Sequence, residues 1–506
     1  MAHTSSTSKI GDLIAHYREK RGMTQSEFAK KLKTSQSAVA RMEKGEQNFS
    51  TEMLVKIGSV LKHDIITLSG DDLNLRITGG RPLKGTVTIN RSKNSAVGLL
   101  CASLLNKGTT VLKKMPQIAE VERIIEVLES IGVDVEWRDN NDIVIKRPDK
   151  LHLEKLDIEA ARKTRSIIML LGPLMHEYDE FSLPQAGGCR LGTRTVRPHF
   201  FALEKFGVKI SVTDSEYQVK VGTRKSADIV LYESGDTVTE NAIMAAALLP
   251  GKTTIKFASA NYMVQDVCYF LEHLGASIKG IGTTTLEIEG LSSIKKNIEY
   301  TPSQDPIEAM FFLAVAIVTN SPLTLIGCPI DFLELELYKL QKMGFKYDIL
   351  QEYVADNGHT RLVDIKTHPS KLVALDEKIE ARPFPGINID NLPFFTLIAT
   401  QAKGRTLIHD WVYEDRAVYY RELNKIGADV VQADLHRVYV QGKVNFHPAK
   451  VVCPPALRPA ALILAGMLAA PGESILRNVY SINRGYEDLA QRLNKLGAKV
   501  EVLHGM

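Results

Sequence analysis

The segment Leu183–Arg194 reads Leu-Pro-Gln-Ala-Gly-Gly-Cys-Arg-Leu-Gly-Thr-Arg and combines residue types that can do chemistry. Its glycines allow sharp turns and a close approach of the backbone to a ligand. Cys189 lies between Arg190 and Arg194, and nearby guanidinium groups favour a thiolate or an anionic substrate beside it. The alternative interpretation is a surface turn with an incidental cysteine, and composition alone does not separate the two.

Composition excludes several classes of protein. The 506 residues leave room for several domains, and 44% hydrophobic with 24% charged residues is typical of soluble globular proteins. No apolar run reaches the ~18 residues of a membrane helix, and residues 1–9 lack the apolar core of a signal peptide. The five cysteines are scattered without a CxxC pair, which argues against a disulfide framework or zinc site and for a cytoplasmic location.

The positive charge is concentrated at one end of the chain. Residues 1–70 contain 11 Lys/Arg and 7 Asp/Glu, whereas the remaining 436 residues contain 52 of each. We therefore expect any polyanionic partner to meet the N-terminal segment.

Residues 1–70 have the apolar spacing of four short amphipathic helices. Thr24-Gln-Ser-Glu27 has the pattern of a capping box that opens the second helix. A tight turn at Lys33–Ser35 precedes the third helix, which we expect to stop at Gly45.

The segments Met23–Leu32 and Ser37–Gly45 resemble the helix-turn-helix of small repressor domains of the XRE/Cro type. The resemblance implies that the third helix enters a major groove of DNA. The alternative is a four-helix interaction module without a DNA role. Among the residues that would contact DNA, Gln36, Ser37 and Arg41 would face bases. The residues that would meet phosphates are Gln25, Lys30, Lys31 and Lys44.

Residues 71–506 repeat one pattern six times: an apolar helix, a glycine and then a strand. The glycines are Gly132, Gly207, Gly275, Gly344, Gly427 and Gly497, between 68 and 83 residues apart. A glycine in this place is typical of a helix C-cap before the chain turns into a strand. A period near 73 residues is too long for the common solenoids.

Six such α/β units resemble the enolpyruvyl transferases, the superfamily of EPSP synthases and UDP-N-acetylglucosamine enolpyruvyl transferases. The resemblance implies an α/β fold: a two-globule inside-out α/β barrel with a six-fold repeat, preceded by the small all-α helix-turn-helix domain. The two crossovers between globules would form a hinge. The expected domains are 1–70 and 71–506 with a linker at 69–72; globule 1 would span about 91–301, and globule 2 about 73–90 plus 302–506.

The loop around Cys189 is similar to the catalytic loop of UDP-N-acetylglucosamine enolpyruvyl transferases. Five further motifs stand in family order along the chain, two before this loop and three after it. The resemblance implies that Cys189 protonates C3 of phosphoenolpyruvate, that Asp390 is the base, and that Lys93 and Arg484 complete the catalytic set. It also implies that no metal or organic cofactor is required. The implied substrate-binding residues are Lys93, Asn94, Arg165, Arg194, Asp390, Val412, Arg458 and Arg484.

Several residues depart from the family pattern. The loop before Cys189 and the segment Phe384–Asp390 are both longer than usual. Arg197 follows the loop where the family usually has an aspartate near the uridine, and Glu233 stands near a usual pocket lysine. Either a swapped ion pair or a different nucleotide sugar would account for these two changes.

Three hypotheses about function follow. The first is transfer of the enolpyruvyl group of phosphoenolpyruvate to the 3-hydroxyl of UDP-N-acetylglucosamine, the first committed step of peptidoglycan synthesis. The second keeps this reaction but uses another uridine nucleotide as acceptor. The third is a DNA-binding regulator whose enzyme-like body senses a metabolite. The expected partners are therefore the two substrates, with DNA at residues 1–70 and no membrane.

Overall fold

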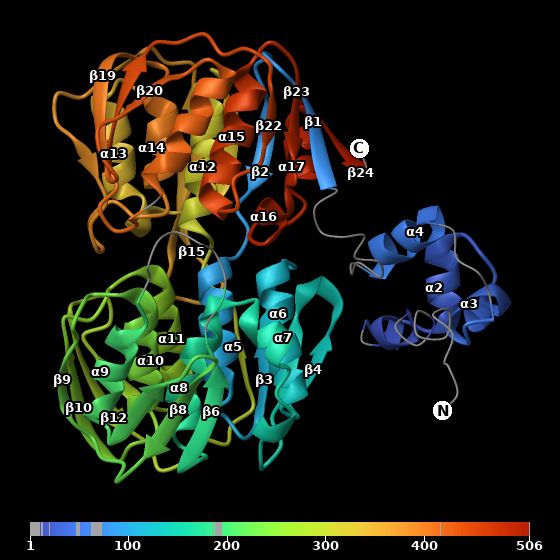
Figure 1. Ribbon diagram of the computed structural model, residues 1–506, viewed down its shortest axis with the longest axis vertical. Helices are drawn as coiled ribbons and strands as arrows, with labels where there is room; N and C mark the ends of the chain where they lie inside the picture. The colour runs from blue at the N-terminus through green and yellow to red at the C-terminus, as the bar shows by residue number, and fades with distance from the viewer. Residues whose placement is uncertain are drawn as a thin grey trace.

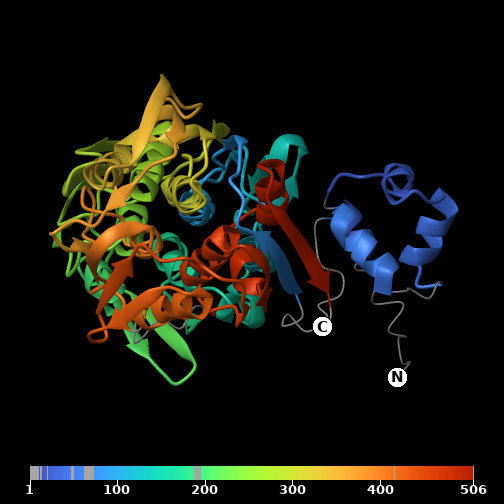
Figure 2. The same ribbon diagram turned by 90° about the horizontal axis from the view of Figure 1, so that it is seen from above.

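The computed structural model describes residues 11, 14–19, 21–46, 51–61, 73–185, 187, 195–414 and 416–504. These residues form a two-globule body and a small helical module beside it (Figures 1 and 2). The linker expected at residues 69–72 lies outside the described residues, as do Cys189, Arg190 and Arg194.

The helical module has its own core. Residues 14–19 are helical, followed by α2 (Gln25–Leu32), α3 (Gln36–Glu43) and α4 (Thr51–Leu61). The predicted capping box is confirmed: Glu27 N donates to Thr24 Oγ1 at 3.2 Å, and Thr24 N donates to Glu27 Oε2 at 2.8 Å. The apolar spacing is confirmed as well, because the buried core consists of Ile14, Phe28, Ala29, Leu32, Val39, Met42, Leu54, Ile57 and Leu61.

Globule 1 contains three sheets. Their strand orders are β13-β3-β5-β4, β6-β8-β7 and β11-β12-β10-β9. The strands are β3 (Thr109–Leu112), β4 (Asp134–Trp137), β5 (Ile143–Lys146), β6 (Glu180–Pro184), β7 (Val208–Val212), β8 (Glu216–Val221), β9 (Asp228–Val230), β10 (Gly251–Lys256), β11 (Ser277–Lys279), β12 (Thr285–Gly290) and β13 (Ile298–Tyr300). The helices are α5 (Lys93–Ser103), α6 (Ala119–Ser130), α7 (Ile158–Arg162), α8 (Leu171–Leu174), α9 (Arg197–Glu204), α10 (Asp236–Ala246) and α11 (Tyr262–Leu274), with a 3-10 helix η3 (Arg165–Leu170).

Globule 2 also contains three sheets, with strand orders β22-β23-β1-β24, β15-β16-β14-β2 and β17-β19-β21-β20. The strands are β1 (Leu73–Gly79), β2 (Gly85–Thr88), β14 (Leu323–Pro329), β15 (Lys346–Val354), β16 (Arg361–His368), β17 (Leu372–Val373), β18 (Ile379–Glu380), β19 (Ala402–His409), β20 (Asp429–Gln432), β21 (Arg437–Gly442), β22 (Lys450–Val452), β23 (Gly472–Arg477) and β24 (Lys499–His504). The helices are α12 (Pro306–Val318), α13 (Glu334–Lys342), α14 (Leu392–Ala399), α15 (Leu457–Ala469), α16 (Tyr480–Asn483) and α17 (Leu489–Lys495), with a 3-10 helix η5 (Ala417–Ile426).

The predicted six-fold repeat is visible in the backbone. The six repeat glycines all have positive φ angles, between 91° and 108°. Side chains other than glycine rarely adopt this conformation, so glycine at these positions allows the chain to leave a helix and turn toward a strand. In the described part of the chain, the six repeats thus correspond to six sheets, three in each globule.

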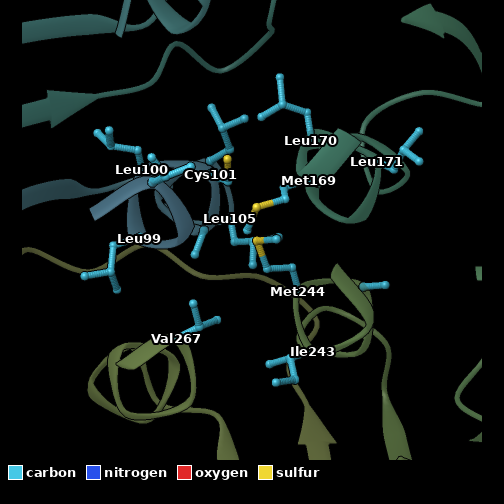
Figure 3. Close-up of a cluster of buried hydrophobic side chains, with 14 of the residues drawn as sticks. Leu99, Leu100, Cys101, Leu105, Met169, Leu170, Leu171, Ile243, Met244 and Val267 are labelled. Atoms are coloured by element: carbon cyan, nitrogen blue, oxygen red, sulfur yellow. The ribbon is translucent and has the colours of Figure 1, made fainter. Parts of the chain in front are cut away.

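The central helices are buried on all sides. Every residue of α12 and of α14 is buried, and α5, α10 and α15 are buried over nearly their whole length. A helix that is apolar all round is stable only inside a core. Figure 3 shows part of such a core in globule 1, where Leu105, just after α5, lies beside Met169 of η3 and Met244 of α10. The structure therefore has the expected arrangement, with helices inside and sheets outside.

Two chain segments cross between the globules side by side. Ser92 N donates to Ser303 O and Asp305 N donates to Asn90 O, both at 2.9 Å, with Arg91 opposite Gln304. Each crossing ends directly at a helix, since Ser92 caps α5 and Asp305 caps α12. The domain boundaries proposed from the sequence, near residues 70, 91 and 301, stay a prediction.

Candidate active site

A cavity of about 630 Å³ lies between the two globules, and both contribute to its wall. Seven of the predicted catalytic and substrate-binding residues line it, although they lie up to 391 positions apart: Lys93, Asn94, Arg165, Asp390, Val412, Arg458 and Arg484. Two other predicted members of the site, Cys189 and Arg194, lie outside the described residues. This cavity is called the cleft below.

Lys93 and Asn94 stand at the N-terminal turn of α5, where Ser92 Oγ accepts hydrogen bonds from the backbone N–H groups of Asn94 and Ser95. Asn94 Nδ2 donates to Tyr262 Oη at 3.2 Å. Burial lowers the pKa of Lys93, while the nearby Glu120 carboxylate opposes this shift. A lysine at the positive end of a helix forms a good binding point for a phosphate or carboxylate.

Arg484 of globule 2 reaches across the cleft to α6 of globule 1. Its Nη2 donates to Glu120 Oε2 at 2.9 Å, and Thr164 Oγ1 donates to Glu120 Oε1 at 2.6 Å. Burial alone would raise the pKa of Glu120. The charges of Lys93 and Arg484 outweigh this effect and hold the pKa of Glu120 below its usual value. Glu120 therefore sits as an anion between two cations that the resemblance assigns to substrate.

Asp390 faces two arginines. Arg458 Nε donates to Asp390 Oδ2 at 3.4 Å, and Arg416 Nη1 lies 3.6 Å from Asp390 Oδ1. Arg416 is itself held by Asp410, with its Nε 2.6 Å from Oδ2 and its Nη2 2.9 Å from Oδ1. Asp390 thus lies between two guanidinium groups, and an ionised carboxylate at this position can accept a proton.

Arg165 and residues of α10 form another part of the cleft wall in globule 1. Burial, and secondarily the charge of Arg165, lower the pKa of His199 to about 3, so His199 is neutral near pH 7. Asp236 accepts hydrogen bonds from Ser259 Oγ at 2.5 Å and Asn261 Nδ2 at 3.2 Å. Glu240 lies one turn further along α10 and is buried, and its Oε1 has no hydrogen-bond partner. Burial, and secondarily the charge of Asp236, raises the pKa of Glu240.

Sequence reasoning did not find Glu120, Asp236, Glu240 or Arg416, all of which line the cleft. For Glu120 a signal was present. It shares a helix face with Ile124 and Val127, so a carboxylate stands on the apolar side of an amphipathic helix. The other three have no comparable signal in the sequence.

The two departures from the family pattern lie in different places. Glu233 lines the cleft, whereas Arg197 is exposed at the start of α9 and does not line it. No ion pair joins these two residues, both of which the structure describes. The hypothesis of a swapped ion pair is therefore wrong: their positions leave Glu233 as the change that faces a ligand.

The candidate DNA-binding residues lie in the helical module. Gln36, Ser37 and Arg41 are exposed on α3, while Gln25 is half-buried and its Nε2 donates to Glu43 Oε2 at 2.8 Å. Lys30, Lys31 and Lys44 are exposed. A DNA-contacting role for these residues stays a prediction.

In the described part of the chain, no group of three or more His, Cys, Asp or Glu side chains is arranged to hold a metal ion. None of its helices is both long and apolar enough to cross a membrane.

Comparison with protein families identifies the family of the two globules that surround the cleft. Residues 77–493 match the family described as EPSP synthase (3-phosphoshikimate 1-carboxyvinyltransferase). The chain belongs to this enolpyruvyl transferase family. Residues 14–64 match the helix-turn-helix family, so this enolpyruvyl transferase carries an N-terminal helix-turn-helix domain.

Individual relatives agree with this assignment. The UDP-N-acetylglucosamine 1-carboxyvinyltransferase of Treponema denticola is 33% identical over 430 residues, covering 84% of this chain and 98% of the relative. The enzyme of the same name from Helicobacter pylori is 32% identical with the same coverage. Among solved structures, the enolpyruvyl transferase NikO from Streptomyces tendae has the same fold, with a TM-score of 0.73, 23% identity and coverage of 86% of this chain and 100% of NikO.

Proposed function

We propose that this enolpyruvyl transferase moves the enolpyruvyl group of phosphoenolpyruvate to the 3-hydroxyl of UDP-N-acetylglucosamine, in the cytoplasm, as the first committed step of peptidoglycan synthesis. The observation that carries the proposal is the gathering of Lys93, Asp390 and Arg484 in one cleft from both globules. Relatives at 32–33% identity that bear this enzyme name support the choice of acceptor.

The cationic residues of the cleft suit phosphoenolpyruvate, which carries a phosphate and a carboxylate. In the proposed reaction Lys93 and Arg484 hold these anions, together with Arg165, Arg194 and Arg458. Fixed cations from two globules orient the substrate and stabilise charge that develops during reaction. Asn94 and Val412 would contact the acceptor.

The proposed proton transfers use one base and one acid. Asp390 takes the proton of the 3-hydroxyl as its oxygen adds to C2 of phosphoenolpyruvate, and Cys189 donates a proton to C3. Return of a proton from C3 to the Cys189 thiolate then reforms the double bond as the C–O bond to phosphate breaks. The products are the enolpyruvyl ether and inorganic phosphate, so atoms and charges balance without a cofactor.

Phosphate release measured with the full chain tests the reaction. We expect release with phosphoenolpyruvate plus UDP-N-acetylglucosamine and a product heavier by one enolpyruvyl group in mass spectrometry. Cys189→Ala should abolish release, whereas Cys453→Ala, which removes a thiol that does not line the cleft, should retain it. Turnover only with another uridine nucleotide would overturn the choice of acceptor, for which Glu233 is the residue to examine. No phosphate release with any nucleotide sugar would leave the metabolite-sensing regulator as the better hypothesis.

We also propose that the helix-turn-helix domain binds DNA through α3. The exposure of Gln36, Ser37 and Arg41 on one helix, together with the basic charge of residues 1–70, supports this role. Selection of bound duplexes from a random pool with the full chain tests it, and recovery of no enriched sequence would favour an interaction module instead.

A further inference from the structure

Helix α6 contacts globule 2 at its first turns. Glu120 pairs with Arg484, and the guanidinium carbon of Arg123 lies 5.5 Å from the ring centre of Tyr480. Both partners belong to globule 2, whereas α6 belongs to globule 1. This part of α6 therefore contacts globule 2 at Arg484 and Tyr480.

The opposite face of α6 meets the helix-turn-helix domain. Successive helical residues are rotated by about 100°, so Glu122 points roughly 200° away from Glu120. Glu122 Oε1 lies 3.7 Å from Arg21 Nη2, and the Arg21 guanidinium stands 5.4 Å from the ring centre of Trp137. The Arg21 and Glu122 side chains are only 14% and 19% exposed, so this contact is largely excluded from water.

Two further features belong to the helix-turn-helix side of this contact. Arg21 Nε donates to Leu61 O at 3.1 Å, which ties the contact to the end of α4. Burial, followed by the charges of Glu126, Glu122 and Glu129, raises the pKa of Tyr17. Those three glutamates are spaced four and three residues apart and share one helix face. Arg21 therefore forms the docking contact with the body, and Tyr17 lies within electrostatic reach of the same face of α6.

The docking contact leaves the recognition helix open. Figure 1 shows α3 on the side of the helix-turn-helix domain away from the body, and its residues Gln36, Ser37 and Arg41 are exposed. A change in docking would thus reorient α3 relative to the body without first having to uncover it.

We propose that α6 couples occupancy of the cleft to docking of the helix-turn-helix domain. The phosphate or carboxylate of phosphoenolpyruvate competes with Glu120 for Arg484, so ligand binding loosens one face of α6. The Arg21–Glu122 and Arg21–Trp137 contacts on the other face then change. Such coupling is reciprocal, so a ligand that undocks the domain must bind more tightly when the domain is undocked. The inference rests on the proposed function only in taking phosphoenolpyruvate as the ligand.

Trp137 provides an optical reporter for this proposal. The chain contains two tryptophans, and Trp411 lines the cleft, so the full-length Trp411→Phe variant reports on Trp137 alone. We expect Glu120→Gln in this background to shift the emission maximum of Trp137 without ligand, and Glu159→Gln, an exposed control, to leave it unchanged. Titration with phosphoenolpyruvate should give a saturable shift whose midpoint equals the dissociation constant from calorimetry.

Removal of Arg21 separates coupling from other effects on the fluorescence. Because the coupling is reciprocal, Arg21→Ala should abolish both shifts and tighten binding of phosphoenolpyruvate, while the kcat of phosphate release stays unchanged. Arg81→Ala, at an exposed arginine of globule 2, should retain both shifts and the affinity of the parent chain. Deuterium exchange of residues 14–19 should rise with Glu120→Gln and with ligand in the parent chain but not in Arg21→Ala.

The outcomes distinguish the two proposals. Unchanged Trp137 emission and unchanged exchange in Glu120→Gln would overturn the coupling, as would shifts that persist in Arg21→Ala. A chain that responds to Glu120→Gln but shows no calorimetric binding of phosphoenolpyruvate would support the coupling and overturn the proposed function.

Discussion

Arg484 of globule 2 and Glu120 of globule 1 form an ion pair across the cleft, with 2.9 Å between Nη2 and Oε2. The pair lies beside Lys93, so two cations share one carboxylate. Under the proposed function, a substrate anion that bound these cations would displace or reorganise the pair. Glu120 would then set the strength of substrate binding together with Lys93 and Arg484.

Glu120→Gln should move the alkaline limb of the kcat/KM profile to lower pH. Burial lowers the pKa of Lys93, and the Glu120 carboxylate opposes that shift. Loss of the carboxylate lowers the pKa of Lys93 further, so its charge disappears at a lower pH. Phosphate release measured as a function of pH checks this, with Glu159→Gln as an exposed control. A limb that moves upward or stays in place would contradict the assignment of Lys93 to substrate.

Asp390→Asn should lower kcat by about 10²–10⁴-fold, the usual contribution of a general base. The amide keeps the shape of the side chain but cannot accept the hydroxyl proton. Single-turnover phosphate release measures the chemical step, and Asp376→Asn provides an exposed control with the same change. Loss of substrate affinity with an unchanged chemical step would show that Asp390 binds the acceptor without acting as the base.

Arg416→Met should destabilise globule 2 by about 3–5 kcal/mol, because it leaves the Asp410 carboxylate buried without its partner. The exposed fractions of the two side chains are 1% and 0%. Urea denaturation measures the free energy of unfolding. The double variant with Asp410→Asn should recover part of the loss, whereas Arg437→Ala, at an exposed ion pair, should leave stability unchanged.

Arg41→Ala should weaken binding to the selected DNA duplex by about 1–3 kcal/mol, the usual value of a base contact. Lys44→Ala should weaken binding to all duplexes alike and reduce the salt dependence, as expected for a phosphate contact. Fluorescence anisotropy at several salt concentrations separates these effects, with Arg81→Ala as control. Equal losses for both variants on every duplex would indicate that Arg41 contacts only phosphates.

Local patterns in the sequence determined a large part of this protein. The repeat glycines mark helix ends because a positive φ angle is a local requirement, and Thr24 and Glu27 form their capping box within four residues. The motifs around Lys93, Asp390 and Arg484 likewise identified residues that meet in the cleft.

Tertiary structure alone decided which charges meet. Glu120 and Arg484 are 364 positions apart, and Arg21 and Glu122 belong to different domains. No local rule pairs such residues, since their contact depends on how whole globules and domains pack. For the same reason Arg197 and Glu233, which the sequence suggested as partners, do not form an ion pair. Helix α6, in contrast, joins the cleft on one face to the helix-turn-helix domain on the other.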